Sequence, residues 1–305
     1  MERRYLLCLG LLLLIAAGGW KWLMAPRFTI RLPADWSFHA QYLGNLVYAD
    51  ARGNLPRQRR LNLYQRDIHP LNWQQDKAVL QDSYRTIDVE TGEVTWESQL
   101  RFEIDPASGK ILNYANHPEA RGRFYLFPQG ATKTDYPFFS YDLAPITMRF
   151  HREEMIDSVP LNVYRFQGQL DYTELYRDAY IGAIEAPGVT GEARIVTYHL
   201  FRELWVEPVT GEVVHIVEDD PGDYLVHPTT GEPGRILCVW AAKSTGRTMK
   251  FLLEQARERQ WQLRLHRQLI PGLLLGGALF CLGVGLGVPG RARRLLLRSG
   301  RDDGC

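Results

Sequence analysis

Cysteine is scarce in this sequence, and its distribution excludes a disulfide-stabilised fold. The four cysteines are Cys8, Cys238, Cys281 and Cys305, and only Cys238 lies in the long central portion of the chain. No disulfide can form within that portion, so an apolar core has to stabilise it. We expect Cys238 to be a small buried apolar residue, with a reactive thiol as the alternative.

Catalytic motifs and an excess of charge of one sign are lacking as well. The sequence contains no G-x-S-x-G, phosphate-binding loop, H-E-x-x-H or paired-cysteine motif, and its formal net charge is +1. These absences argue against an enzyme, a bound cofactor, a metal site and a nucleic-acid partner. A cation site stays open at one place. Asp219, Asp220 and Asp223 around Pro221-Gly222 form either a cation-binding loop or an ordinary polar turn.

Two long apolar runs are present, one near each end of the chain. Ile270–Val288 carries no charged residue and is long enough to cross the roughly 30 Å of bilayer hydrocarbon as a helix. Tyr5–Trp20 is a second such run, with arginines before it and Trp20, Lys21 and Trp22 at its end. We expect an uncleaved membrane anchor there, and a cleaved secretory signal is the alternative.

The basic residues beside these runs predict the orientation in the membrane. Arg3 and Arg4 precede the first run, and five arginines follow the second, so both termini are expected to be cytoplasmic. The chain is therefore expected to be a two-pass protein of the cell membrane with an extracytoplasmic main domain. Four arginines lie on the supposed outer side, namely Arg257, Arg259, Arg264 and Arg267. They count for less because large domains are exported largely regardless of charge.

The central portion alternates apolar and polar residues and repeats one type of turn. An acidic residue or histidine begins each turn, a Thr or Ser follows, and a glycine ends it at Gly92, Gly109, Gly211 or Gly231. This chemistry is typical of a β-hairpin with a type I turn followed by a left-handed glycine. The fold class is therefore predicted to be β-rich (α+β), with antiparallel sheets and hairpins between two transmembrane helices.

Aromatic residues are concentrated in one stretch between the hairpins. They form either part of the core or the wall of a groove for an apolar or glycan-like ligand. The candidate ligand-binding residues are Phe124, Phe127, Tyr136, Phe138, Phe139 and Tyr141.

A stretch without glycine or proline precedes the second apolar run. Within it, Met249, Leu252, Leu253, Ala256 and Leu263 form an apolar stripe at helical spacing. The expected order is an N-terminal transmembrane helix (1–25), a β-rich extracytoplasmic domain (26–242), an amphipathic helix (243–268), a C-terminal transmembrane helix (269–289) and a basic cytoplasmic tail (290–305). The β-rich domain is further expected to consist of two related halves, about 26–150 and 151–242.

The order of these parts is accompanied by a set of turns and aromatic residues, namely Asp88–Val94, Phe127-Pro128, Lys133, Tyr136, Asp142, Val163–Phe166 and Trp205–Val214. In this order and in these residues the chain resembles the porin PorA family, a membrane family formerly described as a domain of unknown function. The sequence departs from the family's pattern at Phe139-Ser140-Tyr141-Asp142, where an aromatic-Trp-Asp motif is usual.

The resemblance implies a pore and brings no catalytic residue with it. The strands themselves are too few and too charged to form a lipid-facing barrel. We therefore expect a non-enzymatic, membrane-anchored protein that binds an envelope lipid or polymer or serves as an envelope scaffold. The alternatives are an oligomeric channel, as the family name implies, and an envelope enzyme. The expected partners are the lipid bilayer, an envelope lipid or polymer, and further copies of the chain.

Overall fold

The structure is a computed structural model, in which the chain divides into two compact units. One unit comprises Met1–Arg31 with Arg259–Cys305, and the other comprises Leu32–Glu258. The residues described are 2–26, 36–50, 52–56, 60–74, 76–106, 108–114, 122–123, 125–139, 146–171, 194–227 and 230–286.

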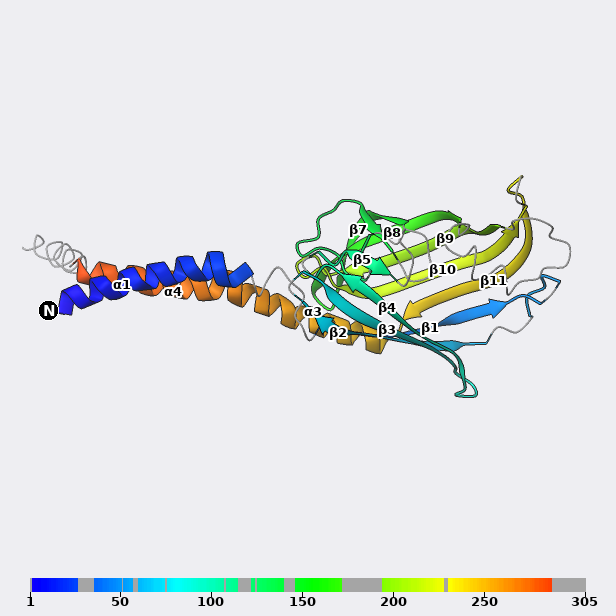
Figure 1. Ribbon diagram of the computed structural model, residues 1–305, viewed down its shortest axis with the longest axis horizontal. Coiled ribbons are helices and arrows are strands. Elements are labelled where there is room, and N and C mark those ends of the chain that lie inside the picture. Colours follow the sequence, from blue (N-terminus) through cyan, green and yellow to red (C-terminus); the bar gives the residue numbers. More distant parts are fainter. Residues whose placement is uncertain are drawn as a thin grey trace, which may run out of the picture. The chain divides into compact units, whose positions relative to one another are not determined.

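The larger unit contains one antiparallel sheet of eleven strands (Figure 1). The strands are β1 (Phe38–Tyr48), β2 (Asn62–Trp73), β3 (Ala78–Asp88), β4 (Val94–Ile104), β5 (Ile111–Tyr114), β6 (Tyr136–Phe138), β7 (Ile146–Ile156), β8 (Val159–Asp171), β9 (Arg194–Val206), β10 (Val213–Val226) and β11 (Pro233–Ser244). Their order across the sheet is β5-β4-β3-β2-β1-β11-β10-β9-β8-β7-β6. The predicted β-rich fold class is confirmed.

The repeated turns form the hairpins that the sequence predicted. In each turn the N–H of the final glycine donates to the carbonyl of the first residue, at 2.8–2.9 Å. All four glycines, at positions 92, 109, 211 and 231, have φ between +68° and +79°, which only glycine adopts without strain. These turns connect β3 to β4, β4 to β5, β9 to β10 and β10 to β11.

Two long-range contacts join the halves of the sheet. The first strand pairs with the last, and Gly44 of β1 lies opposite Ala242 of β11. A Cβ atom at Gly44 would lie 2.6 Å from the Ala242 Cα atom, so this close pairing requires glycine. At the other side of the sheet, Arg123 bridges both Lys110, next to β5, and Phe138 of β6.

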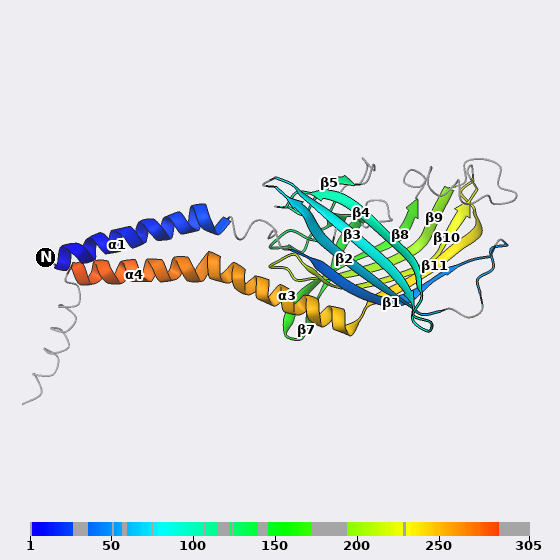
Figure 2. The same ribbon diagram turned by 60° about the horizontal axis from the view of Figure 1, so that its bottom comes forward.

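The sheet curves strongly, and its strands surround one interior (Figures 1 and 2). Because side chains alternate along a strand, one set points into this concave face and the other lies on the convex face. Helix α3 (Gly246–Arg264) packs through its first turns on the convex side, where the Gln41 N–H donates to Thr248 Oγ1 at 2.8 Å. Leu252 and Leu253 of α3 are buried in the core.

The smaller unit is a hairpin of two apolar helices. It contains α1 (Glu2–Gly19), the π-helical turn η1 (Trp20–Met24), the π-helical turn η2 (Leu265–Leu269) and α4 (Ile270–Gly285). Arg3–Met24 and Gly246–Gly285 are each long and apolar enough to cross a membrane, by length and composition. Most of the large apolar side chains of α1 and α4 are exposed, as lipid-facing side chains would be.

Small residues bring α1 and α4 into close contact. A Cβ atom at Gly10 would lie 2.7 Å from Leu282 Cγ, and one at Gly285 would lie 2.9 Å from Leu7 Cδ2. The helices are antiparallel, so the start of α1 and the end of α4 lie at the same end of the hairpin. This arrangement places both termini of the hairpin on one side of any membrane that it crosses.

Candidate functional site

The segment Tyr125–Ala131 fills one end of the concave face. Its backbone is fixed to the turn between β9 and β10, because the Phe127 N–H donates to the Gly211 carbonyl at 2.7 Å and the Ala131 N–H donates to the Pro208 carbonyl at 2.7 Å. Tyr125 then contacts Phe38 on one side of the interior, with ring centroids 5.5 Å apart. On the other side, Phe127 stacks on Tyr164 at 4.7 Å.

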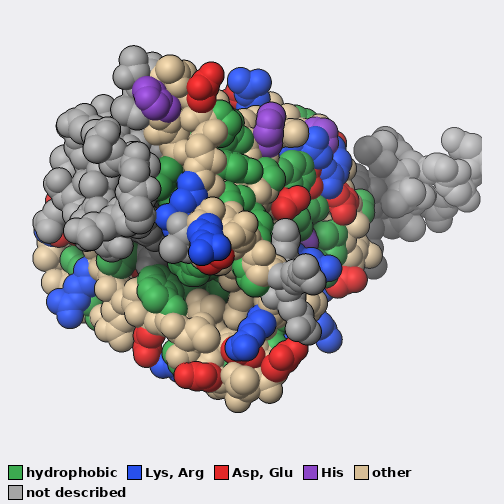
Figure 3. Space-filling view, turned by 90° about the vertical axis from the view of Figure 1, so that its right-hand side faces the viewer, with side chains coloured by type: hydrophobic (Ala, Val, Ile, Leu, Met, Phe, Trp, Pro, Cys, Tyr) green, Lys and Arg blue, Asp and Glu red, His purple; other side chains and the backbone are tan. Residues whose placement is uncertain are grey.

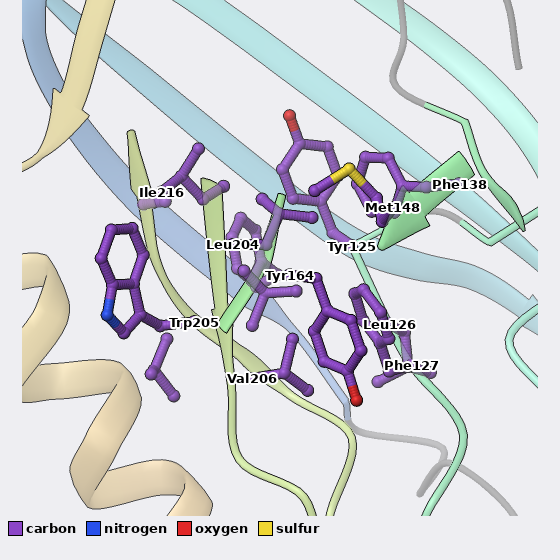
Figure 4. Close-up of a cluster of buried hydrophobic side chains, with 14 of the residues drawn as sticks. Tyr125, Leu126, Phe127, Phe138, Met148, Tyr164, Leu204, Trp205, Val206 and Ile216 are labelled. Carbon is purple, nitrogen blue, oxygen red and sulfur yellow. The ribbon is translucent and has the colours of Figure 1, made fainter. Parts of the chain in front are cut away.

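Two of the predicted ligand-binding residues, Phe127 and Phe138, lie in this packed end (Figure 4). Phe127, Phe138 and Phe139 are each 1% exposed. Tyr136 is half-buried, and its hydroxyl accepts the Thr132 N–H at 2.9 Å. Phe124 and Tyr141 lie outside the described residues. The geometry of the described members is that of a core, and their role in ligand binding stays a prediction.

The opposite end of the concave face carries a row of aromatic rings from four strands. Trp240 of β11 lies 4.8 Å from Tyr64 of β2, which lies 6.1 Å from Tyr84 of β3, and Tyr84 lies 5.2 Å from Trp96 of β4. Tyr64 is fully buried, whereas Trp96 is 46% exposed. The row therefore runs from the core into solvent.

Aliphatic and aromatic side chains beside this row are also incompletely buried. By strand register, Leu46, Leu100 and Phe166 point to the same concave face and are half-buried. Figure 3 looks at the end of the sheet where β1 finishes, and hydrophobic side chains gather there around a hollow. We refer to the concave face around Leu46, Tyr84, Trp96, Leu100, Phe166 and Trp240 as the aromatic hollow.

The charged groups next to the aromatic hollow are paired within the wall. Glu218 of β10 accepts a hydrogen bond from Trp240 Nε1 at 2.9 Å and lies 2.7 Å from Arg202 Nε of β9. Arg66 and Asp82 form a second buried pair, with Nη2 and Oδ2 2.5 Å apart. Opposite charges so close neutralise each other, so neither pair attracts an ionic ligand strongly.

Two carboxyl groups lie further along the same wall. Asp220 accepts the Gly222 N–H at 2.8 Å, and Asp223 accepts hydrogen bonds from Thr197 and from the Cys238 thiol, the latter at 3.2 Å. Burial, with Asp223 nearby, raises the pKa of Asp220 to about 8. Burial also raises the pKa of Asp223. Asp220 is therefore largely protonated at neutral pH and adds little negative charge to the hollow.

The sequence-based interpretation of this segment needs correction. Asp219, Asp220 and Asp223 form neither a cation loop nor a free turn, because they belong to β10. Pro221-Gly222 is accommodated as an irregularity in the pairing between Asp220 and Asp223. Among the residues that the structure describes, no group of three or more His, Cys, Asp or Glu side chains is placed to hold a metal ion.

Sequence reasoning missed the aromatic hollow because its residues are far apart in the chain. Tyr64, Tyr84, Trp96 and Trp240 each come from a different strand, and the strand order brings them together. The alternation of apolar and polar residues along each strand carried a signal for their common face, because each of the four occupies an inward-facing position of its strand.

Comparisons with known proteins give one strong match. The model of the family described as Porin PorA matches residues 4–287 of the chain. None of the curated proteins matches it.

Similarities to solved structures are weak. A protein of Parabacteroides distasonis described as a candidate lipoprotein is 9% identical, with 70% of this chain and 96% of that chain covered and a TM-score of 0.28. A conserved hypothetical protein of Mycobacterium tuberculosis with a double hotdog fold is 11% identical, with 68% and 74% covered and a TM-score of 0.14. At these scores neither likeness supports an inference about fold or function.

Proposed function

The chain belongs to the porin PorA family, and on that premise we propose that it is a two-pass membrane protein whose sheet binds an apolar, lipid-class molecule of the cell envelope in the aromatic hollow. The observation that carries this proposal is the incomplete burial of the side chains that define the hollow. The same concave face is tightly packed at its other end. Apolar side chains left in contact with water at one end favour the binding of an apolar ligand there.

The chemistry of the hollow favours a lipid over a carbohydrate polymer. Its rings offer stacking and apolar contact, while the nearby charges of Arg202, Glu218, Arg66 and Asp82 are occupied by one another. A glycan needs several free hydrogen-bonding groups, whereas an acyl or polyprenyl chain needs mainly apolar surface. The proposed role is therefore non-enzymatic binding of a lipid by a membrane-anchored domain.

Lipid analysis of the purified full-length chain tests this role. The chain is extracted from its membrane in mild detergent, and the co-purifying lipid is identified by mass spectrometry. Leu46→Glu with Leu100→Glu places two charges in the hollow and is expected to lower the retained lipid about tenfold or more, because each substitution removes apolar contact. Equal amounts of lipid in both proteins would contradict the proposal.

The matched control carries the same substitutions outside the hollow. Met155 and Val209 are 63% and 38% exposed, and Met155→Glu with Val209→Glu is expected to retain lipid like the parent chain. Thermal unfolding of both variants in detergent separates a lost site from a lost fold.

The proposed orientation has its own test. In cells whose protein keeps Cys305 as its single cysteine, a thiol reagent that cannot cross the membrane is expected to leave Cys305 unlabelled. A cysteine introduced at exposed Glu93 in the β3–β4 turn is expected to be labelled. Labelling of Cys305 in intact cells would show that the orientation is the opposite one, and the proposed source of the ligand in the envelope would then be wrong.

An oligomeric channel is the second candidate function. Apart from the description of the family, the observation that favours it is the open space beside Gly272, Gly276 and Gly283 of α4, where a Cβ atom would meet no neighbour within 4 Å. Another hairpin can approach closely at such positions. Ion flux through proteoliposomes that contain the full chain tests this alternative.

A further inference from the structure

Trp20 and His266 are in contact and join the two helices of the hairpin at one level. The Trp20 Nε1–H donates to the His266 carbonyl at 3.1 Å, and the two rings stack with centroids 5.7 Å apart and an interplanar angle of 11°. Both residues lie in π-helical turns, η1 and η2. This contact places the residues that follow Trp20 and those that precede Ile270 at the same end of the hairpin.

Exposed tryptophans and cations surround this level. Trp22 is 75% exposed and Trp261 is 56% exposed. Lys21, Arg264 and Arg267 are exposed as well. Tryptophan beside exposed cations is typical of the headgroup layer of a membrane, where the indole lies between the acyl chains and water.

Acidic residues are absent from the sequence around these cations. Neither 3–26 nor 259–286 contains an Asp or Glu. Within the described part of the chain, Lys21 and Arg264 have no ion-pair partner, whereas many cations of the sheet are paired, as in Arg85–Glu97 and Arg152–Glu203. Exposed cations without internal counter-charges, here Lys21 and Arg264, attract negative charge from outside the chain.

The length of the first helix indicates the depth in the membrane at which that negative charge lies. From Arg4 to Trp20 the helix rises about 24 Å, close to the thickness of bilayer hydrocarbon. If Arg4 lies at one surface of the bilayer, Lys21, Arg264 and Arg267 lie at the level of the headgroups of the other. Guanidinium groups bind phosphate through two parallel hydrogen bonds, and the lysine adds a compact charge.

We propose that Lys21, Arg264 and Arg267 form a binding surface for the phosphate of anionic lipid headgroups, at the end of the hairpin opposite its termini. The proposal rests on the proposed function in one respect only, namely that the hairpin crosses a membrane. It adds a lipid contact that is separate from the aromatic hollow and specific for charge. Under the proposed orientation, this contact is in the outer leaflet.

Lipid retention by the full chain tests this surface. The chain is reconstituted in vesicles of equal parts phosphatidylcholine and phosphatidylglycerol, extracted in mild detergent, and analysed for retained lipid by mass spectrometry. The parent chain is expected to retain phosphatidylglycerol in excess. Lys21→Gln with Arg264→Gln and Arg267→Gln is expected to lower that excess roughly tenfold or more, since each cation near a membrane surface strengthens the attraction to anionic lipid.

A charge-matched variant is the control. Arg101→Gln with Lys110→Gln and Lys250→Gln removes the same charge from exposed positions of the sheet and α3, and it is expected to retain phosphatidylglycerol like the parent chain. The excess is also expected to fall in high salt, because surface electrostatics are screened. An unchanged excess in the hairpin variant, or an equal loss in the control, would overturn the proposal.

Two further measurements separate this proposal from the proposed function. Flotation of the parent chain and the hairpin variant with vesicles reports insertion, and failure of the parent chain to float would refute the membrane-spanning hairpin itself. The variant Leu46→Glu with Leu100→Glu is expected to keep the excess of phosphatidylglycerol. If that variant loses it, the retained anionic lipid belongs to the aromatic hollow and the hairpin surface is refuted.

Discussion

Arg66 of β2 and Asp82 of β3 form a buried bidentate ion pair on the concave face. Arg66 Nε lies 3.1 Å from Asp82 Oδ1, Nη2 lies 2.5 Å from Oδ2, and the side chains are 4% and 0% exposed. The guanidinium carbon also lies 4.3 Å from the ring centroid of Tyr125. The pair thus connects the sheet to the segment that fills its interior.

Replacing one member of this pair is expected to lower the free energy of unfolding much more than replacing both. Arg66→Met leaves the Asp82 carboxylate buried without a counter-charge, at a loss of about 3–5 kcal/mol in the free energy of unfolding. The double variant Arg66→Met with Asp82→Leu is expected to regain most of that loss. Chemical denaturation of the full chain in detergent, followed by tryptophan fluorescence, measures both. A double variant as unstable as Arg66→Met would show that the pair has no such coupling.

Two equivalent turn glycines are expected to tolerate substitution very differently. Gly92 and Gly211 both have φ above +70°, but a Cβ atom at Gly92 would meet nothing within 4 Å. At Gly211 it would collide with the carbonyl of Phe127 and lie 2.7 Å from the Phe127 carbonyl carbon. Gly92→Ala therefore carries only backbone strain, about 1–2 kcal/mol.

Gly211→Ala adds displacement of the segment around Phe127, and we expect it to cost about 3 kcal/mol or more. Thermal unfolding of the two variants under identical conditions compares them directly. Equal losses would mean that Phe127 is not held against this turn.

These glycines also show what the sequence could predict. A turn is local, so its Asp or Glu, its Thr and its glycine appear together in the sequence, and the hairpins at Gly92, Gly109, Gly211 and Gly231 were predicted correctly. The two long apolar helices were predictable for the same reason, since their signal is a continuous run.

The pairing of β1 with β11 could not be predicted in this way. It brings Leu46 beside Trp240, and no local pattern links residues so far apart. The aromatic hollow depends on this pairing and was therefore missed. The prediction for the segment around Pro221-Gly222 was wrong for a different reason. These residues are typical of a turn, but the pairs that β10 makes with β9 and β11 on both sides of them keep the strand continuous.

Asp220 is expected to make the stability of the sheet dependent on pH. Its pKa is about 8 in the folded chain, chiefly through burial, against an ordinary value of 3.8. Between these two pH values the folded chain binds a proton that the unfolded chain has released. The contribution of Asp220 to stability is therefore greatest below about pH 4 and falls as pH rises toward about 8. The loss attributable to this group is on the order of a few kcal/mol.

Asp220→Asn is expected to remove most of this fall, because an amide stays neutral and still accepts the Gly222 N–H. Asp219→Asn is the control, since Asp219 is exposed on the same strand. The free energy of unfolding is measured across this range for both variants and the parent chain. A parent chain with the same slope as Asp220→Asn would show that Asp220 is ionised throughout.

Close contact between α1 and α4 is expected to depend on Gly10 and not on Gly18. A Cβ atom at Gly10 would lie 2.7 Å from Leu282 Cγ and 3.1 Å from the Ala278 carbonyl oxygen, whereas one at Gly18 would meet nothing within 4 Å. Helices in a membrane associate chiefly through such close packing. Gly10→Leu is therefore expected to separate the helices, and Gly18→Leu is expected to leave them paired.

Cysteine cross-linking in the membrane measures this pairing. In a chain without its native cysteines, Leu13→Cys and Gly277→Cys place two thiols at a contact, since a Cβ atom at Gly277 would lie 3.4 Å from Leu13 Cδ1. Oxidation is expected to join them efficiently in the parent background and with Gly18→Leu. With Gly10→Leu the yield is expected to fall several-fold, because separation of the helices moves the two thiols apart and a disulfide forms only at short range. The same yield in all three proteins would show that this glycine contact does not hold the hairpin together.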